Sequence, residues 1–220
     1  MPDEPTRADT LAPAKARSTR RARSRLGPLL KLRFPANARL TDELFEALAV
    51  ANPVLRLERT SRGDLEIMAP AGAESSSRNF QISYQLARWT ENEGRGLGIG
   101  FDSSLGSILP NTAIRGPDAA WITQARWDAL TPEQRQKYLN FCPDFVAELR
   151  SPSDRMTKLR EKLREYLANG ARLGWLIDPK SRTIEVYRPG RAVEVLAQPA
   201  TLSGEDVLPG FVLDLNKIWA

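Results

Sequence analysis

The chain has 220 residues, enough to bury the core of one domain, and no apolar run approaches the roughly 20 residues that span a bilayer. Its 41% hydrophobic and 27% charged residues are typical of a globular protein, and its formal net charge of +5 permits a polyanionic partner. Histidine is absent, which excludes Ser-His-Asp and Cys-His catalysis and imidazole-based zinc sites. Catalysis would therefore have to use carboxylates, lysine, arginine or a hard metal ion.

The positive charge is concentrated near the N-terminus. The first 31 residues contain eight Lys or Arg residues and only three acidic ones. This composition is typical of a disordered, solubilising tail, which is the interpretation that we favour. The alternative is a segment that binds phosphate through counterion release. We expect a basic tail over residues 1–33 and one folded domain over residues 34–220. The single cysteine, Cys142, and the lack of a signal-peptide pattern indicate the cytoplasm, and we expect no membrane segment.

Helical and strand patterns alternate in the first half of the domain. Thr41 is predicted to cap a helix that ends before Pro53. The glycines up to Gly100 lack the Lys-Ser or Lys-Thr of a phosphate-binding loop, so we interpret them as the end of a helix. The other predicted elements of this half are a hairpin, a helix and a strand, over 54–57 with 65–67, 75–93 and 97–101.

The second half continues this alternation and ends in strands. The sequence predicts, in order, a strand 118–122, a helix from Thr131 to about Tyr138, an apolar strand 145–149, an amphipathic helix 157–169, a hairpin of 175–177 with 183–187, and a third strand 193–196. The whole order favours a single α/β domain with a mixed sheet.

Two carboxylates fall in or beside apolar strands. Asp118 follows Pro117 at the start of one strand, and Glu148 lies inside another about thirty residues later. A buried carboxylate without a partner costs several kcal/mol or stays protonated, so this pair calls for a cation. Mg²⁺ takes oxygen ligands of this kind and can activate water against a phosphodiester. The alternative is structural: Asp118 would cap a turn, and Glu148 would pair with Arg150 or face solvent.

Lys162 adds a third polar group. On the predicted helix it lies about 60° from the centre of the apolar stripe, where a long side chain can reach back over the sheet. An ammonium there would orient water or stabilise charge on phosphoryl oxygens. The alternative is an exposed lysine paired with Glu161 or Glu165.

Several segments together resemble the Uma-two family of PD-(D/E)XK endonucleases, relatives of the restriction enzymes, over roughly residues 40–218. The segments are Gly116-Pro117-Asp118, residues 143–153 around Glu148, Lys162 with Tyr166 and Gly170, residues 175–179, and Leu208-Pro209-Gly210-Phe211. The resemblance implies an α/β fold with a restriction-endonuclease-like mixed β-sheet core flanked by helices. It also implies Asp118 and Glu148 as ligands of Mg²⁺ (or Mn²⁺), Lys162 as the essential lysine, and Glu58 as an upstream acid that helps to hold metal or water. A surface glutamate is the alternative for Glu58.

The chain departs from the family pattern at two positions. Arg150 stands two residues after Glu148, where the broader superfamily pattern has lysine and this family usually does not, and it would contact phosphate or pair with an acid. Asn79 stands where many members have histidine. Asp144 is a competing acidic residue at a strand start, and we prefer Asp118 because only Asp118 begins a separate strand.

These observations predict a Mg²⁺-dependent endonuclease that hydrolyses nucleic-acid phosphodiester bonds, with DNA as the favoured substrate by family analogy alone. The first alternative is a non-catalytic nucleic-acid-binding or accessory protein that retains the fold. The second is an interaction domain in which the two acids are structural. Symmetric cleavage of duplex DNA would suit a homodimer.

Overall fold

The structure, a computed structural model, describes residues 30–35 and 38–219. Its largest sheet is six-stranded with the order β11-β10-β9-β8-β7-β4. Only β8 and β9 run parallel, and the other neighbours are antiparallel. The strands are β4 Gly98–Phe101, β7 Ala119–Thr123, β8 Phe145–Leu149, β9 Leu173–Asp178, β10 Thr183–Tyr187 and β11 Glu194–Ala197.

A second sheet is five-stranded and antiparallel, with the order β1-β3-β2-β6-β5. Its strands are β1 Leu30–Leu32, β2 Arg56–Arg59, β3 Leu65–Met68, β5 Ser107–Ile108 and β6 Ile114–Arg115. A small third sheet pairs β12 Thr201–Ser203 with β13 Val212–Asp214. The helices are α1 Asp42–Ala51, α2 Ala73–Glu91, α3 Gln124–Asp128, α4 Pro132–Arg135, α5 Met156–Ala168 and α6 Asn216–Trp219.

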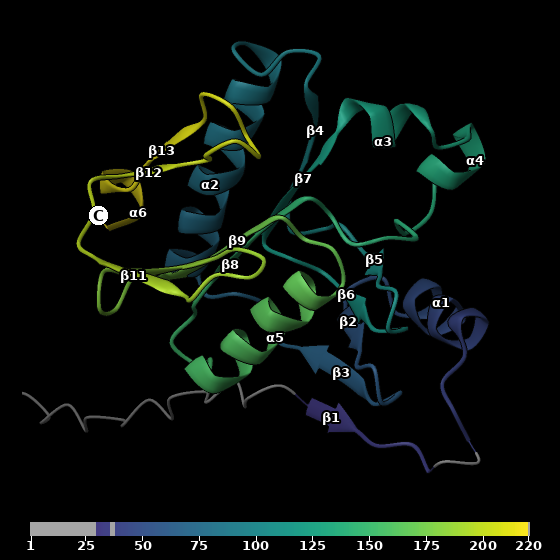
Figure 1. The fold of residues 1–220 in the computed structure, drawn as a ribbon. Coiled ribbons are helices and arrows are strands. Elements are labelled where there is room, and N and C mark those ends of the chain that lie inside the picture. Colours follow the sequence, from purple (N-terminus) through teal and green to yellow (C-terminus); the bar gives the residue numbers. More distant parts are fainter. Residues whose placement is uncertain (1–29, 36–37, 220) are drawn as a thin grey trace, which may run out of the picture.

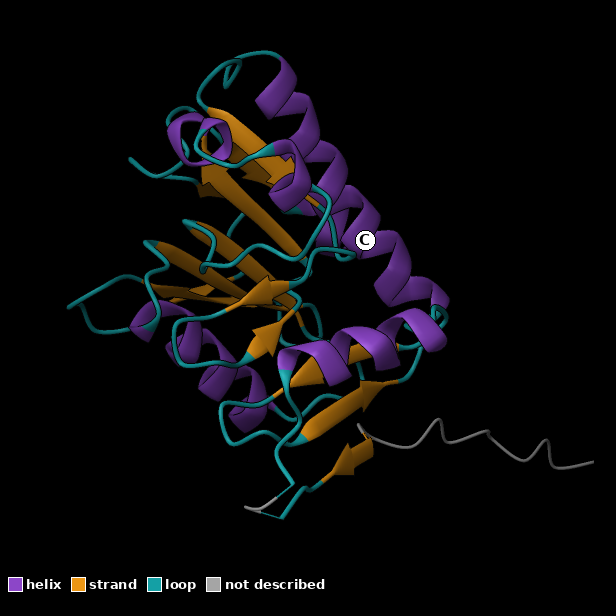
Figure 2. Cartoon of the chain, turned by 90° about the vertical axis from the view of Figure 1, so that its right-hand side faces the viewer, coloured by secondary structure: helices purple, strands orange, loops and turns teal. Residues whose placement is uncertain are grey.

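Helices cover both faces of the six-stranded sheet. In Figure 1, α2 and the C-terminal elements lie on one side of the sheet and α5 on the other. Figure 2 gives the same arrangement from the side, with strands between the long helix α2 and the shorter α5. This layering explains why all five residues of β8 are buried, since a strand covered on both faces needs apolar side chains on each.

Side chains alternate along β8, and this alternation sets the side of the sheet to which Glu148 points. Phe145, Ala147 and Leu149 pack in the core cluster that contains α2. Val146 packs in the cluster that contains α5. Because side chains alternate along a strand, Glu148 points to the same side as Val146, toward α5.

Helix α5 is the crossover between the two parallel strands, and it approaches the sheet closely. A side chain added at Gly174 of β9 would meet Leu163 Cδ1 at 2.8 Å. The helix ends at Ala168, and the chain turns away at Gly170, whose φ of 110° is a conformation that favours glycine. This close packing sets the height of the α5 side chains above the sheet.

The chain passes from one sheet to the other between β6 and β7. The three residues Gly116, Pro117 and Asp118 make this link, and all three are buried. Asp118 donates its backbone N–H to the carbonyl of Ala147 (3.0 Å), which joins the link to β8. Asp118 is therefore held where the two sheets meet.

Most of the predicted elements are present, with small shifts at their ends. The capped helix, the two hairpins, the strand of Glu148 and the amphipathic helix are confirmed. The helix predicted to reach Tyr138 ends instead at Arg135. Residues 1–29 of the expected tail lie outside the described residues. Residues 30–32 of that tail were wrongly assigned, because they form β1, in which Leu30 pairs with Ile67.

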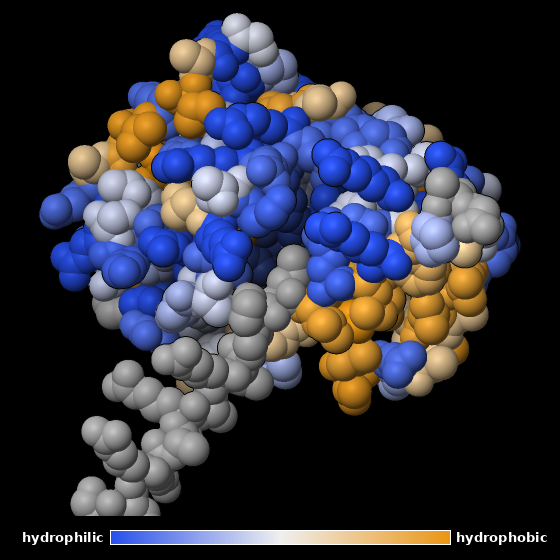
Figure 3. All heavy atoms as spheres, turned by 90° about the horizontal axis from the view of Figure 1, so that it is seen from below, coloured by the Kyte–Doolittle hydropathy of each residue, from blue (hydrophilic) through white to orange (hydrophobic). Residues whose placement is uncertain are grey.

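Seen from below the view of Figure 1, the surface is hollowed near its middle, and mainly hydrophilic residues surround the hollow (Figure 3). Hydrophobic residues gather in patches to either side of it.

In residues 30–35 and 38–219, no helix combines the length and the apolar character that a membrane crossing requires.

Candidate active site

Four segments that are distant in sequence bring the predicted polar residues together. Glu58 comes from β2, Asp118 from the link between the sheets, Glu148 from β8 and Lys162 from α5. The three carboxylate residues are buried, with exposed fractions of 3%, 8% and 3% in that order. The structure thus places all four predicted residues in one buried cluster.

Lys162 joins two of the carboxylates. Its Nζ lies 2.8 Å from Glu58 Oε1 and 2.8 Å from Glu148 Oε1, and it donates to the Gly116 carbonyl at 3.1 Å. Burial favours the neutral amine, but Glu148 and Glu58 outweigh burial and raise the pKa of Lys162 above its ordinary value. Lys162 is therefore an ammonium at neutral pH.

Glu58 uses both of its carboxylate oxygens inside the protein. Oε1 accepts hydrogen bonds from Lys162 and from the backbone N–H of Gly116 (3.0 Å), and Oε2 accepts one from Arg115 Nη1 (3.1 Å). Burial disfavours the ionised carboxylate, but the positive charges of Lys162 and Arg115 outweigh burial and lower the pKa of Glu58 to about 2. Glu58 is thus a fixed anion that holds the lysine and the start of the link to Asp118.

Arg115 extends the network beyond the predicted residues. Besides Glu58, its guanidinium donates to Glu66 (2.8 Å) and Glu165 (2.6 Å). Glu66 belongs to β3 and Glu165 to α5, so one arginine ties the second sheet to the helix that carries Lys162.

Asp118 is anchored on one oxygen and paired with a cation on the other. Oδ2 accepts the backbone N–H of Leu149 at 2.8 Å. Oδ1 accepts from Arg56 Nη1 at 3.1 Å and from the amide of Asn79 at 3.3 Å. Arg56 also donates to the carbonyl of Gly116. The hydrogen bond to Oδ2 fixes the side chain. Oδ1 faces the guanidinium of Arg56, which another cation could replace.

Glu148 is the least compensated acid of the cluster. Burial raises its pKa, the ammonium of Lys162 opposes that rise, and the charges of Asp118 and Glu58 add to it, so that the pKa reaches about 7. Its Oε1 also accepts the hydroxyl of Tyr166 at 3.3 Å. The difference from Glu58 has a clear cause, because both share Lys162 but only Glu58 has Arg115 as well.

The network holds more negative than positive charge. Glu66 also pairs with Lys31, which pairs in turn with Asp64. With every carboxyl group ionised, the linked residues are therefore six carboxylates and four cations, a formal surplus of two negative charges: Glu58, Asp64, Glu66, Asp118, Glu148 and Glu165 against Lys31, Arg56, Arg115 and Lys162. A divalent cation would balance this surplus, and carboxylate oxygens are the donors that Mg²⁺ prefers. The residues present thus fit such an ion.

The described residues contain no group of three or more His, Cys, Asp or Glu side chains arranged to hold a metal by themselves. Mg²⁺ commonly binds through one or two carboxylates and retains several waters. The pair of Asp118 and Glu148 matches that smaller requirement.

Two other charged residues singled out in the sequence, Asp144 and Arg150, have their partners outside this cluster. Asp144 directly precedes β8, at the end opposite Glu148, where it accepts hydrogen bonds from Arg126 (2.9 Å) and from the backbone N–H of Thr123 (3.0 Å). Arg150 donates to Asp178 at 2.7 Å, so it pairs with an acid while its proposed phosphate contact stays a prediction.

Sequence reasoning missed Arg56 and Arg115. Arg56 stands two residues before Glu58 on β2, and the alternation of a strand places both on one face, so the period of two was a usable signal. Arg115 directly precedes Gly116-Pro117-Asp118, but its three partners come from three other elements, which no local pattern shows.

Comparisons with known proteins agree with this fold. Residues 42–216 match the Uma2 family, described as "Putative restriction endonuclease". The structure is similar to that of a "putative nuclease belonging to DUF820 from Anabaena variabilis ATCC 29413", with a TM-score of 0.62 and 20% sequence identity, over 74% of this chain and 89% of that one. No curated protein matches the chain. The structural likeness confirms the predicted mixed α/β fold, and the family match extends over most of the sequence: the chain belongs to the Uma2 family.

Proposed function

We propose that this protein is a metal-dependent endonuclease that hydrolyses phosphodiester bonds of nucleic acid at the cluster of Glu58, Asp118, Glu148 and Lys162. The observation that carries the proposal is the surplus of two negative charges in a buried network that also holds a lysine ammonium beside Glu148. A purely structural cluster would gain stability from balanced charges, whereas an unbalanced one calls for a ligand.

Asp118 and Glu148 would hold Mg²⁺ or Mn²⁺ in this site. When bound, the ion would polarise a phosphoryl oxygen and lower the pKa of a bound water. The chain contributes the position of both ligands: the Leu149 amide fixes one oxygen of Asp118, and β8 fixes Glu148 at the join of the two sheets.

Lys162 acts through its charge in this proposal. Because its pKa is raised, it holds its proton at neutral pH and cannot accept one from water. Its ammonium instead donates hydrogen bonds, which orient a water or stabilise negative charge that develops on the phosphate. Glu58 is a positioning residue, since its oxygens accept hydrogen bonds from Lys162, Arg115 and the Gly116 amide.

Arg150 is proposed as a contact for a neighbouring phosphate. It lines a cavity of about 280 Å³ together with Arg78 and Lys180. Its Nε is buried and has no hydrogen-bond partner in the described part of the chain, so a donor is available there. The paired acid Asp178 limits the net positive charge of this cavity.

DNA as the substrate, a homodimeric assembly and a cytoplasmic location belong to this proposal. The family description as a restriction endonuclease supports a nucleic-acid substrate. The single, buried, free Cys142 is suited to a reducing compartment.

One observation favours a second candidate, a non-catalytic nucleic-acid-binding or accessory protein. Arg56 already occupies Oδ1 of Asp118, and a cluster in which arginine stands permanently at that oxygen would not take a metal there. This candidate predicts nucleic-acid binding without cleavage and without a response to Mg²⁺.

A cleavage assay separates the two candidates. Single- and double-stranded DNA and RNA are incubated with the full chain in Mg²⁺, in Mn²⁺ and in EDTA, and Lys162→Gln is compared with Lys158→Gln. Lys158 is an exposed lysine of the same helix that pairs with Glu161. The endonuclease proposal expects cleavage by the wild type and by Lys158→Gln only with metal, and loss of cleavage in Lys162→Gln. Binding without cleavage of any substrate would establish the accessory candidate instead.

A further inference from the structure

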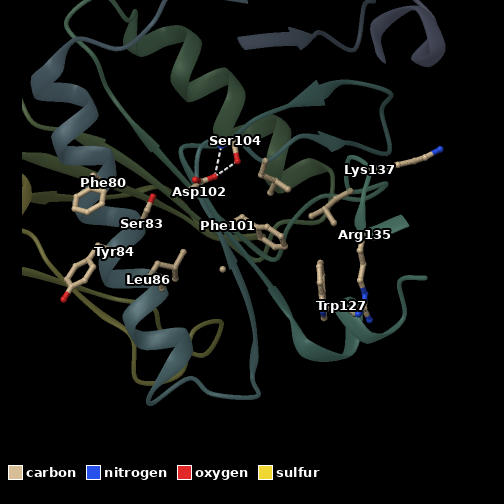
Figure 4. A pocket seen from close by; sticks show the side chains of 14 residues that line it. Phe80, Ser83, Tyr84, Leu86, Phe101, Asp102, Ser104, Trp127, Arg135 and Lys137 are labelled. Carbon is tan, nitrogen blue, oxygen red and sulfur yellow. Dashed lines mark hydrogen bonds between the residues drawn. The ribbon is translucent and has the colours of Figure 1, made fainter. Parts of the chain in front are cut away.

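A groove with aromatic and basic side chains lies beside the catalytic cluster. It encloses about 660 Å³, within the range of small-ligand sites. Figure 4 shows its walls: Phe80, Ser83, Tyr84 and Leu86 of α2 on one side, and Trp127, Arg135 and Lys137 on the other, with Phe101, Asp102 and Ser104 between them.

The aromatic residues of the groove are unusually exposed. Phe80 and Tyr84, one turn apart on α2, are 66% and 51% exposed. Their rings are stacked on each other, with centroids 6.4 Å apart and an interplanar angle of 19°. Across the groove, Phe101 and Trp127 form a second ring pair at 6.2 Å. Neither Phe80 nor Tyr84 is needed to fill the core, so these rings are free to stack on a ligand.

The far wall adds positive charge to the aromatic surface. The guanidinium of Arg135 lies 4.6 Å from the ring centroid of Trp127. Lys137 is exposed and makes no ion pair with any residue that the structure describes. The one acid of the lining, Asp102, accepts hydrogen bonds from the backbone and hydroxyl of Ser104 (2.9 and 2.6 Å). A ligand with flat rings and negative charge would complement this surface.

Both walls of the groove contain residues that adjoin the proposed active site. Asn79 precedes Phe80 on α2 and donates to Asp118. On the other side, the carbonyl of Leu105, a lining residue, lies 3.0 Å from where a side chain on Gly116 would begin. The groove is therefore placed to take a nucleotide on one side of a phosphate held at Asp118, and the cavity of Arg150 is a separate contact for a neighbouring phosphate.

We propose that this groove binds the unpaired bases of a single-stranded nucleic-acid segment next to the bond to be cleaved. The proposal rests on the proposed endonuclease function and names its substrate class, a strand with unstacked bases. Aromatic rings stack on bases without regard to sequence, and basic side chains follow the backbone. A continuous duplex keeps its bases stacked inside and cannot place them against Phe80 and Tyr84.

The test is equilibrium binding in EDTA, where no hydrolysis can occur. Fluorescence anisotropy of the full chain with a labelled 12-nucleotide oligothymidylate and with a blunt duplex of equal length gives the two affinities. We expect tighter binding of the single strand, weakened by Phe80→Ala or Tyr84→Ala about five-fold to a hundred-fold each. Tyr84→Phe, which retains the ring, should bind as the wild type does.

Three further variants separate stacking from other contacts. Phe80→Leu retains an apolar side chain without the ring, so it should weaken binding nearly as much as Phe80→Ala. Lys137→Gln should lower the slope of log affinity against log salt by about 0.7, as expected for one phosphate contact on a single strand. Lys217→Gln, a change at an exposed lysine of α6, is the matched control and should leave affinity and slope nearly as they are.

Equal affinities of the wild type, Phe80→Ala and Tyr84→Ala would overturn the proposal. Preference for the duplex would overturn it as well. A third result would also overturn it: Phe80→Leu binds the single strand as tightly as the wild type, and sedimentation shows a dimer that Phe80→Ala no longer forms. A second copy of the chain would then cover the groove. The result is independent of the endonuclease proposal: single-strand binding that depends on the rings, without cleavage in Mg²⁺, would retain the groove and reject the catalysis.

Discussion

Lys162 is the residue on which the proposed site depends most. It lies between two buried carboxylates, and its side chain is only 12% exposed. Replacing it would remove the ammonium from the site and leave both acids without that partner. Catalysis and stability are therefore linked at this position.

We expect Lys162→Met to lower the free energy of unfolding by about 3–5 kcal/mol in EDTA, the usual effect of removing one partner of a buried ion pair. Adding Glu148→Gln should restore part of that loss, because Glu148 is the acid that Lys162→Met leaves without a cation, whereas Glu58 keeps Arg115. Urea denaturation of the single and double variants measures both effects. Lys158→Met, which changes an exposed pair on the same helix, is the control, and an equally small effect in the two single variants would contradict the burial argument.

Arg56 is expected to compete with a metal ion for Asp118. Because its Nη1 donates to Oδ1 of Asp118, removing the positive charge should raise Mn²⁺ affinity about ten-fold. Electron paramagnetic resonance of free Mn²⁺ against the wild type and Arg56→Gln measures this directly. Arg126→Gln, whose arginine pairs with the remote Asp144, should leave the affinity unaltered, and weaker Mn²⁺ binding by Arg56→Gln would show that arginine is not a competitor.

The candidate site was only partly predictable at the scale of residues. Asp118 and Glu148 could be predicted because carboxylates beside apolar strands are costly without a partner. The neighbours of Arg115 could not, since Glu58, Glu66 and Glu165 come from three elements and meet only after folding.

At the scale of elements, the unit β8–α5–β9 positions the site. The two strands are parallel neighbours, and α5 crosses between them over the face that Glu148 shares with Val146. The height of α5 depends on Gly174, whose lack of a side chain leaves room for Leu163.

Gly174→Ala is expected to push α5 away from the sheet. The added methyl group would meet Leu163 at 2.8 Å and Leu167 at 3.2 Å, so the protein should lose about 1–3 kcal/mol of stability, as overpacked cores do. Thermal or urea unfolding tests this. Gly72→Ala adds the same group where nothing lies within 4 Å and should change stability by only a few tenths of a kcal/mol; equal losses in both variants would contradict the packing account.

Glu185 joins α5 to β10 and makes stability depend on acid pH. Burial opposes its ionisation, but hydrogen bonds from Arg160 and Tyr187 prevail and lower its pKa. A carboxyl group whose folded pKa is lowered contributes stability above its unfolded pKa, near 4.3, and loses that contribution as pH falls through the folded pKa.

We therefore expect the wild type to lose more stability between pH 6 and pH 3 than Glu185→Gln does. Urea denaturation at both pH values gives the difference. Glu91→Gln makes the same change of charge at an exposed position and should lose as much stability as the wild type. An identical pH dependence of stability in all three proteins would show that Glu185 does not contribute to it.

Long elements could be predicted from sequence, and short ones could not. The helix over 157–169 was predicted nearly at its observed bounds, Met156–Ala168, because an apolar stripe repeats over several turns. The strands β5 and β6 have two residues each, too few for a period. Strand β1 was assigned to the tail because it follows a basic segment and pairs only with the distant β3.

At the scale of the whole molecule, two sheets meet at the link that carries Asp118, and Gly116 in this link lies close both to Arg56 of the candidate site and to Leu105 of the aromatic groove. The fold class could be predicted because the order of elements favours a mixed sheet between helices. The second sheet could not, since its central strand β2 pairs with β6, some 55 residues later, at a single position, Arg59 with Ile114.

The central claim is that Asp118 serves a metal-dependent hydrolysis, and cleavage of a labelled nucleic acid by Asp118→Asn and Asp144→Asn, side by side in Mg²⁺, tests it most directly. Both carboxylates are buried and both accept a backbone N–H, so the two changes disturb folding in similar ways. We predict that Asp118→Asn lowers the cleavage rate about a hundred-fold or more, while Asp144→Asn and the wild type cleave at similar rates and both stop in EDTA. Unchanged cleavage by Asp118→Asn, or cleavage that persists in EDTA, would contradict the claim.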